Sequence, residues 1–225
     1  MVKVNIRDEN FTPFEGSSCH LATNKYVEWV TGNEPVSKSC FITDLCLQDV
    51  EKASGVKRKV AWLLEPRSIH PHMYSWIERN NKLYDFVLTF DDNLIAKGQN
   101  YLYYPHGRCW IHVIKNKEDG LNEYYFSITI ENAILPGYWT EKLLDAFATK
   151  SLPIYYGDKN SVSKYFDPEG IIFFESIDEL NDILSNLSVD YYNKRKDAID
   201  KNFELVEEFR VPEDWIYKQY KFLFE

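Results

Sequence analysis

A repeated alternation between short apolar runs and amphipathic runs constrains this fold more than any other feature of the sequence. Runs rich in β-branched and aromatic residues predict strands, and the segments between them with helical periodicity predict helices. In the first half we expect strands at 2–6, 40–47, 59–64, 85–90 and 100–105, and helices at 72–83 and 91–98. This βαβαβ order predicts a mostly parallel sheet covered by helices.

The alternation is interrupted by a short polar segment at 113–122, VIKNKEDGLN, and then resumes. Ser176, with Glu179 three residues later, forms a capping-box pattern at a helix start, and Pro212 suits the first turn of a final helix. We therefore predict two units, 1–112 and 113–225, with terminal helices of the second packing across both. Beyond the interruption we expect strands at 124–130, 152–157 and 171–175, and helices at 140–149 and 189–209.

Composition excludes several classes of protein. The chain has 225 residues, and its formal net charge of −9 argues against a partner nucleic acid, which needs a basic surface. No apolar run reaches the roughly 20 residues of a membrane span, and the start of the chain shows no signal-peptide pattern, so we expect a cytoplasmic protein. The four cysteines show no CxxC spacing, and His70 and His72 do not share a helix face, so we expect no metal site.

The segment ENAILPGYWTEK, at 131–142, concentrates polar chemistry between a predicted strand and a predicted helix. Ligands bind parallel sheets at this end of the strands, and a helix N-terminus near Thr140 suits a phosphate. Lys142 adds a positive charge, Glu131 and Glu141 suit hydroxyl groups, and the rings of Tyr138 and Trp139 suit stacking. A nucleotide-sugar would use all of these features, but they also fit an ordinary capped helix with a solvated lysine.

The wider segment 126–158, FSITIENAILPGYWTEKLLDAFATKSLPIYYGD, resembles the signature of the α-1,3/4-fucosyltransferases, glycosyltransferase family ten. Weaker similarity lies in WLLEPRSIHP at 62–71 and in the strand–helix–strand segment at 86–111. The resemblance therefore covers most of the chain from about 59 to 174. The matching residues of the signature are Phe126, Glu131, Asn132, Tyr138, Thr140, Glu141, Lys142, Pro153, Ile154 and Gly157.

The resemblance implies an α/β fold of the GT-B type, with two Rossmann-like halves facing a cleft, and an inverting transfer of fucose from GDP-fucose to a glycan acceptor. It implies that Lys142 contacts the donor diphosphate and that Glu141 contacts donor hydroxyls. Glu65, after its strand in the other half, would be the general base. No cofactor beyond the donor is implied. The implied donor-binding residues are Glu131, Asn132, Tyr138, Thr140, Glu141 and Lys142.

The chain departs from the family pattern before Phe126. Only 14 residues, HVIKNKEDGLNEYY, separate Ile111 from Phe126, and no counterpart of the family's diphosphate-binding arginine is evident there. Arg108 is the candidate diphosphate contact nearby. The departure leaves a second hypothesis open, a catalytically weakened protein that binds nucleotide-sugars or glycans, and a third, a transferase of similar fold that uses another sugar.

Overall fold

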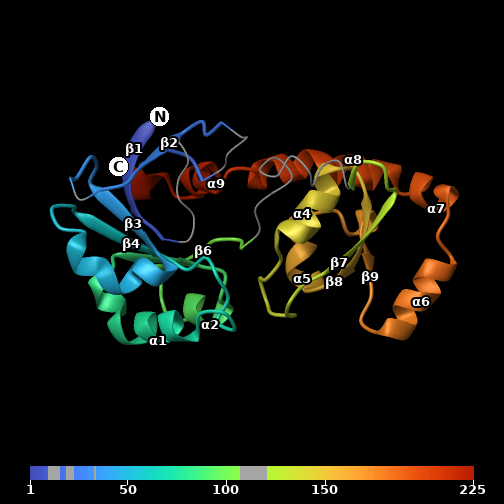
Figure 1. Ribbon diagram of the computed structural model, residues 1–225, viewed down its shortest axis with the longest axis horizontal. Coiled ribbons are helices and arrows are strands. Elements are labelled where there is room, and N and C mark those ends of the chain that lie inside the picture. Colours follow the sequence, from blue (N-terminus) through green and yellow to red (C-terminus); the bar gives the residue numbers. More distant parts are fainter. Residues whose placement is uncertain (10–15, 19–22, 33, 107–120) are drawn as a thin grey trace. The chain divides into compact units, whose positions relative to one another are not determined.

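The computed structural model describes residues 1–9, 16–18, 23–32, 34–106 and 121–225. These form two compact units, one made of Met1–His106 with Val211–Glu225 and the other of Gly107–Arg210 (Figure 1). No helix within the described ranges is both long and apolar enough to cross a membrane.

The first unit is built on a six-stranded sheet with the strand order β2-β1-β3-β4-β5-β6. Every pairing between its strands is parallel, so the predicted parallel sheet is confirmed. The order is that of doubly wound sheets of the flavodoxin type. The strands are β1 (Val2–Arg7), β2 (Val27–Val30), β3 (Ser39–Thr43), β4 (Arg58–Trp62), β5 (Phe86–Thr89) and β6 (Tyr101–Tyr103).

Alternate residues of these strands enter two different cores, as the pleat of a strand requires. On one face Ile42 and Val87 pack with Met73 and Ile77 of the helix α1. That face is covered by η1 (Asp44–Lys52), α1 (Pro71–Asn80), η2 (Asn81–Leu83) and α2 (Asp92–Ile95).

The predicted strand 40–47 was too long, because β3 ends at Thr43. Asp44 turns inward there and accepts hydrogen bonds from two backbone amides beyond β4. The chain then continues as the helical segment η1, which buries Cys46 and Leu47 against the core. The apolar pattern was correctly located, but its second half is helical.

The other face of the sheet carries an aromatic core completed by the end of the chain. Phe41 stacks on Phe224 with ring centroids 5.2 Å apart, and Trp215 meets Tyr104 edge-on with centroids 5.8 Å apart. The segments involved are α9 (Pro212–Gln219) and η5 (Lys221–Phe224). Because these apolar contacts hold Val211–Glu225 in the first unit, the observed division differs from the predicted one at 112 and 113. Most of the predicted junction, 113–122, lies outside the described residues.

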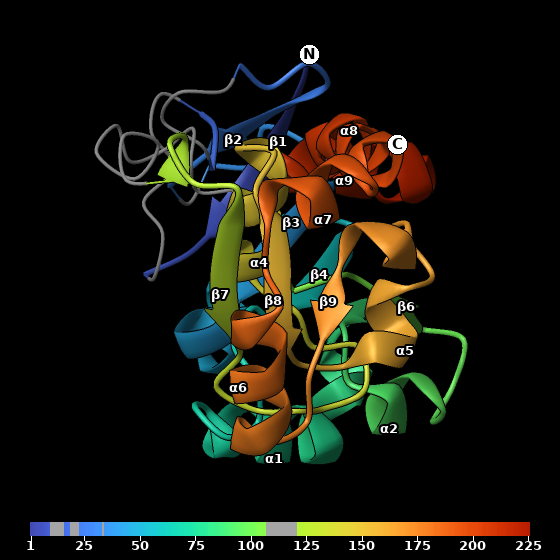
Figure 2. The same cartoon turned by 90° about the vertical axis from the view of Figure 1, so that its right-hand side faces the viewer.

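The second unit is built on a three-stranded parallel sheet with the order β7-β8-β9 (Figure 2). The strands are β7 (Phe126–Ile130), β8 (Leu152–Tyr156) and β9 (Ile172–Phe173). The helical segments are α4 (Glu141–Ala148), α5 (Lys159–Val162), η3 (Pro168–Gly170), α6 (Ile177–Ser185), α7 (Val189–Asn193), α8 (Lys196–Leu205) and η4 (Val206–Phe209). The predicted strands and the α4 helix are confirmed within a few residues.

The predicted single helix at 189–209 is interrupted at Lys194 and Arg195. Neither glycine nor proline stands there, so the interruption comes from tertiary contacts. Tyr192 is buried, and its hydroxyl donates to the carbonyl of Lys150. Further along, buried Asn202 bonds to both backbone groups of Asp167, which fixes α8 against η3. The two pieces are thus anchored at different places.

Candidate functional site

The loop between β7 and α4, taken together with the first turn of α4, begins where β7 ends and carries six of the predicted site residues. Thr140 is the N-cap of α4, and its Oγ1 accepts a hydrogen bond of 3.3 Å from the backbone amide of Lys142. The helix therefore starts where the sequence predicts, at the carboxyl end of a parallel strand, which is where such sheets bind ligands.

Glu131 is the residue that holds this loop in shape. Its side chain is buried, and its two carboxylate oxygens accept from the Thr140 amide at 2.8 Å and the Thr140 hydroxyl at 2.7 Å. The hydroxyl of Tyr155 donates to the same carboxylate at 3.3 Å. Burial raises the pKa of Glu131, and the bonds from Thr140 oppose that rise. Both carboxylate oxygens of Glu131 are therefore already occupied by hydrogen bonds from protein groups.

The Pro-Gly turn of the loop is fixed from a neighbouring segment. Gly137 has φ +78°, in the region that favours glycine. Its amide lies 3.0 Å from Oδ2 of Asp158 and 2.8 Å from Oγ of Ser161, which both accept from it. Asp158 is also the N-cap of α5, so one carboxylate holds the turn and starts a helix.

The two aromatic side chains of the loop are directed into the unit. Trp139 is fully buried and lies edge-on to Phe209 and Phe166, with ring centroids 5.1 and 5.7 Å away. Its predicted stacking on a ligand is therefore wrong, because the ring is part of the core. Tyr138 is buried as well. Asn132, in contrast, is exposed.

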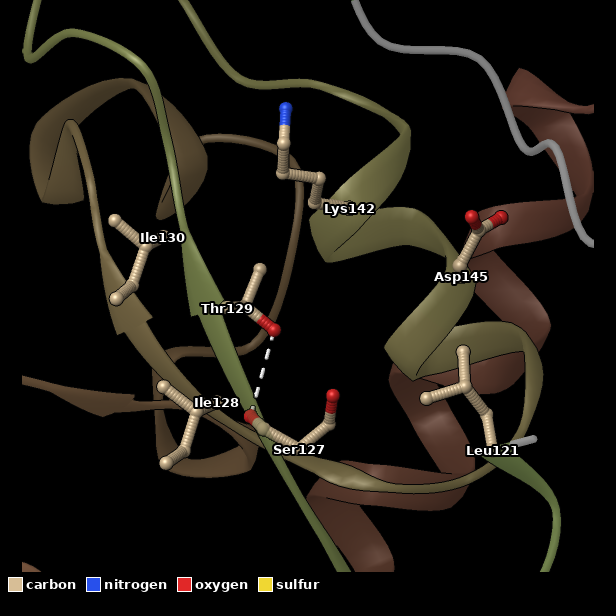
Figure 3. Close-up of a pocket in the computed structure, with 7 residues that line it drawn as sticks. All are labelled: Leu121, Ser127, Ile128, Thr129, Ile130, Lys142 and Asp145. Carbon is tan, nitrogen blue, oxygen red and sulfur yellow. Dashed lines mark hydrogen bonds between the residues drawn. The ribbon is translucent and has the colours of Figure 1, made fainter. Parts of the chain in front are cut away.

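Lys142 is the basic residue of the loop and lies among carboxylates. Its Nζ is 3.8 Å from Glu131 Oε2 and 3.7 Å from Glu141 Oε1, and the side chain is 34% exposed. It lines a pocket of about 350 Å³ between β7 and α4 (Figure 3), together with buried Asp145 and Thr129. The complete lining is Leu121, Ser127, Ile128, Thr129, Ile130, Lys142 and Asp145.

Glu65 lies in the first unit, in the segment that follows β4. The amides of Leu64 and Glu65 donate to the two oxygens of Asp44 at 2.9 and 3.0 Å. The Glu65 carboxylate is 40% exposed and lies 3.9 Å from Nε2 of His106. Burial raises the pKa of Asp44 to about 7, and the two amides oppose this rise.

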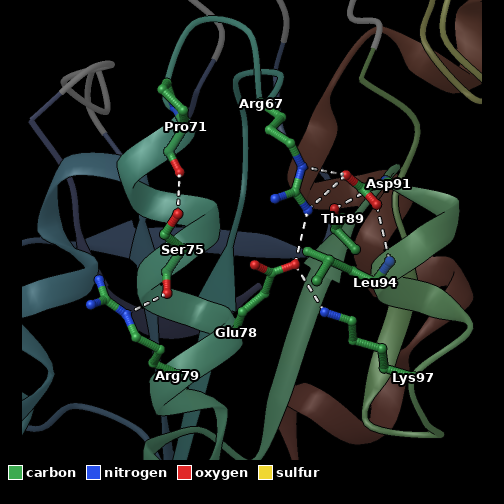
Figure 4. A network of polar contacts seen from close by, with 9 residues as sticks. All are labelled: Arg67, Pro71, Ser75, Glu78, Arg79, Thr89, Asp91, Leu94 and Lys97. Atoms are coloured by element: carbon green, nitrogen blue, oxygen red, sulfur yellow. Dashed lines mark hydrogen bonds and ion pairs between the residues drawn. The ribbon is translucent and has the colours of Figure 1, made fainter.

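An ion-pair network anchors the chain just after Glu65 (Figure 4). The guanidinium of Arg67 lies 3.4 Å from Asp91 and 3.2 Å from Glu78, and it covers the ring of Tyr74 at 4.6 Å. Lys97 adds a second bond of 2.9 Å to Glu78, which is the largest reason that the pKa of Glu78 is lowered. Because Asp91 also caps α2, the segment after Glu65 is tied to the end of β5.

The structure thus brings the six predicted loop residues together in the second unit and places Glu65 in the first. Arg108 lies outside the described residues. Within the described ranges, no group of three or more His, Cys, Asp or Glu side chains could hold a metal ion. Sequence reasoning missed Asp44, Asp145 and His106. Asp44 could have been found because an aspartate interrupts an otherwise apolar run. Asp145 could have been found because it lies one helical turn after Glu141, on the same face of the predicted helix.

The fold resembles solved structures of one kind of glycosyltransferase. A crystal structure of α1,3-fucosyltransferase with GDP has 15% sequence identity and a TM-score of 0.55, covering 92% of this chain and 89% of that one. Another, with GDP-fucose, has 15% identity and a TM-score of 0.51, covering 100% and 90%. An α/β fold with a parallel sheet in each of two units is the GT-B-like fold of these enzymes.

The family follows from a second comparison. The family model for the C-terminal part of glycosyltransferase family 10 (fucosyltransferase) matches residues 100–221. The chain belongs to this family, and the resemblance noted in the sequence is confirmed.

Two curated relatives match shorter segments. Alpha-(1,3)-fucosyltransferase FucT of Helicobacter pylori is 38% identical over 77 residues, which is 33% of this chain and 16% of that protein. Putative fucosyltransferase R654 of Acanthamoeba polyphaga mimivirus is 33% identical over 66 residues, 29% of this chain and 11% of that protein. The matched segments therefore span less than a fifth of either relative's length.

Proposed function

We propose that this protein transfers fucose from GDP-fucose to a hydroxyl group of a glycan acceptor, with inversion at the sugar carbon. Membership of family 10 supports the transfer of fucose. The observation that carries the proposal is the position of Lys142. A lysine in the first turn of α4, beside a pocket that runs along β7, suits the diphosphate of a nucleotide-sugar.

On the donor side, each loop residue takes a role that fits its environment. The ammonium group of Lys142 binds the diphosphate and stabilises the charge that develops on the leaving group. Glu141 and exposed Asn132 form hydrogen bonds with the sugar and ribose hydroxyls. Tyr138 is buried, so it supports the loop from inside the unit. Glu131 and Thr140 support the site without contacting the donor, because the hydrogen bonds between them hold the start of α4 in place.

On the acceptor side, Glu65 is the proposed general base. Its carboxylate is partly exposed, and it follows a strand end of a parallel sheet. As the acceptor oxygen attacks the anomeric carbon of fucose, Glu65 takes the hydroxyl proton. The bond from that carbon to the β-phosphate oxygen breaks, and GDP leaves with its electron pair. Attack opposite the leaving group inverts the configuration.

One observation favours a second candidate, a protein that binds the donor without efficient transfer. Among the described residues that line the pocket, Lys142 is the one cation, and it faces the carboxylates of Glu131 and Glu141. A lysine is a poorer clamp for a diphosphate than a bidentate arginine. GDP release from GDP-fucose that increases with a galactoside or N-acetylglucosaminide acceptor selects the enzyme. Donor binding without turnover selects the second candidate.

Donor binding can be measured through thermal stability. A ligand at 100 times its Kd stabilises the folded protein by about 2.7 kcal/mol, so GDP or GDP-fucose should raise the Tm. Lys142→Ala should remove most of that shift. Lys201→Ala is a matched control, because Lys201 is an ion-paired lysine of the same unit that does not line the pocket. An equal shift in all three proteins would contradict the donor role of Lys142.

The base is tested separately. Glu65→Gln should abolish GDP release in the presence of acceptor and leave the donor-induced Tm shift unchanged, because the amide cannot take the proton. Glu28→Gln, which changes an ion-paired glutamate on β2 of the same unit, is the control. Retained turnover in Glu65→Gln would remove Glu65 from the base role.

A further inference from the structure

We propose that Asp44 is a positioning residue for transfer, which fixes the backbone of Glu65 and so directs its carboxylate at the acceptor hydroxyl. This role rests on the proposed function. Asp44 is not part of the family signature quoted above, and it stands on a different strand connection from Glu65.

The geometry of the contact is specific. Asp44 is completely buried directly after β3, and β3 is paired with β4, the strand that leads to Glu65. Oδ1 of Asp44 accepts from the amide of Leu64 at 2.9 Å, and Oδ2 accepts from the amide of Glu65 at 3.0 Å. Two consecutive amides on one carboxylate fix the orientation of both peptide planes.

A second contact holds the other side of the Glu65 backbone. The Tyr74 hydroxyl donates to the Glu65 carbonyl at 2.9 Å, and the Tyr74 ring lies under the guanidinium of Arg67. The amide and the carbonyl of Glu65 are therefore both held by side chains from other elements, while its carboxylate is 40% exposed. This arrangement leaves the carboxylate accessible on a fixed backbone, as a general base requires.

The protonation of Asp44 couples this arrangement to pH. An ionised carboxylate accepts from both amides, whereas a protonated one uses an oxygen to carry its proton. Among the described residues, the charged and titratable groups that act on Asp44 include Glu65 after β4, Asp8 after β1 and Tyr74 of α1. Burial raises the pKa of Asp44 to about 7. The ionised carboxylate that accepts from both amides therefore becomes more populated as pH rises through neutrality. We therefore expect kcat for transfer to rise there.

The experiment uses the full chain with GDP-fucose and an acceptor that supports turnover. Asp44→Asn should lower kcat by about 10- to 100-fold, the effect of misplacing a reacting group, and leave the donor KM within about 2-fold. It should also remove the rise in kcat near pH 7. Asp85→Asn is the matched control, because Asp85 Oδ2 accepts from the Lys59 amide at 2.7 Å at the opposite end of β4. Amide hydrogen exchange at 63–66 should be faster in Asp44→Asn alone.

The outcomes separate this inference from the proposed function. If the wild type turns over and Asp44→Asn matches Asp85→Asn in kcat, pH profile and exchange, the positioning role is overturned and the base assignment stands. If the wild type does not transfer fucose, the proposed function fails, and positioning for transfer is overturned with it. If Asp44→Asn does not fold, the wild-type profile decides, since a kcat constant from about pH 6 to 8 also overturns the role.

Discussion

Replacing Glu131 should destabilise the start of α4 more than any exposed acid of the loop. Glu131→Ala removes the acceptor used by the Thr140 amide, the Thr140 hydroxyl and the Tyr155 hydroxyl, all at buried positions. A buried donor left without its acceptor costs about 1–3 kcal/mol. Removing a buried carboxylate offsets part of this cost, so we expect a loss of about 2–5 kcal/mol in the free energy of unfolding.

Two variants separate the hydrogen bonds from the charge. Glu131→Gln keeps an oxygen for the Thr140 amide and offers an amide to the Thr140 hydroxyl, so it should cost less than about 1.5 kcal/mol. Glu141→Ala removes a partly exposed acid from the first turn of the same helix and should cost less than about 1 kcal/mol.

Urea denaturation followed by circular dichroism measures these free energies. Hydrogen exchange of a peptide covering 138–145 locates the loss, because the Thr140 amide is protected by Glu131 in the structure. We expect local exchange to be fastest in Glu131→Ala. The reasoning is refuted if Glu131→Ala is no less stable than Glu141→Ala, or if Glu131→Gln is as unstable as Glu131→Ala.

Two further predictions concern packing and pH. A Cβ on Gly170 would lie 2.9 Å from the carbonyl oxygen of Ala198, so Gly170→Ala should lower stability by about 1–3 kcal/mol in a thermal melt. A Cβ on Gly98 would lie 3.3 Å from Oδ1 of the Asn100 side chain, so Gly98→Ala should change stability by less than about 1 kcal/mol. In the folded protein the pKa of Asp44 is raised from 3.8 to about 7. As pH rises between these two values, the unfolded chain releases the proton while the folded protein retains it. The free energy of unfolding therefore falls, by up to about 4 kcal/mol. Denaturation of the wild type and Asp44→Asn across this range should show the fall only in the wild type, and parallel curves would contradict it.

Much of the fold could be predicted from local sequence, because strand and helix patterns are local. The run 126–130 and the helix after Thr140 lie where their periodicity and cap residues place them. The position of the candidate donor loop followed from this, since strand ends of parallel sheets are ligand sites in general. Lys142 and Glu141 therefore needed no tertiary information to be selected.

Local patterns failed where a distant contact decides the conformation. The run 40–47 is apolar throughout except for Thr43 and Asp44, and Asp44 ends the strand because it bonds to amides some 20 residues later. The helix at 189–209 contains no breaking residue, and contacts with Lys150 and Asp167 divide it.

By itself, the sequence determined the parallel α/β architecture, the family and the position of the candidate donor loop, because these depend on periodicity and short motifs. Tertiary structure alone decided which side chains of that loop are buried and which remain accessible. A carboxylate and an indole ring can both contact a ligand. In this structure both side chains are buried, so Glu131 holds Thr140 and Trp139 belongs to an aromatic core. Burial depends on what packs against a residue from elsewhere in the chain, and no local pattern contains that information.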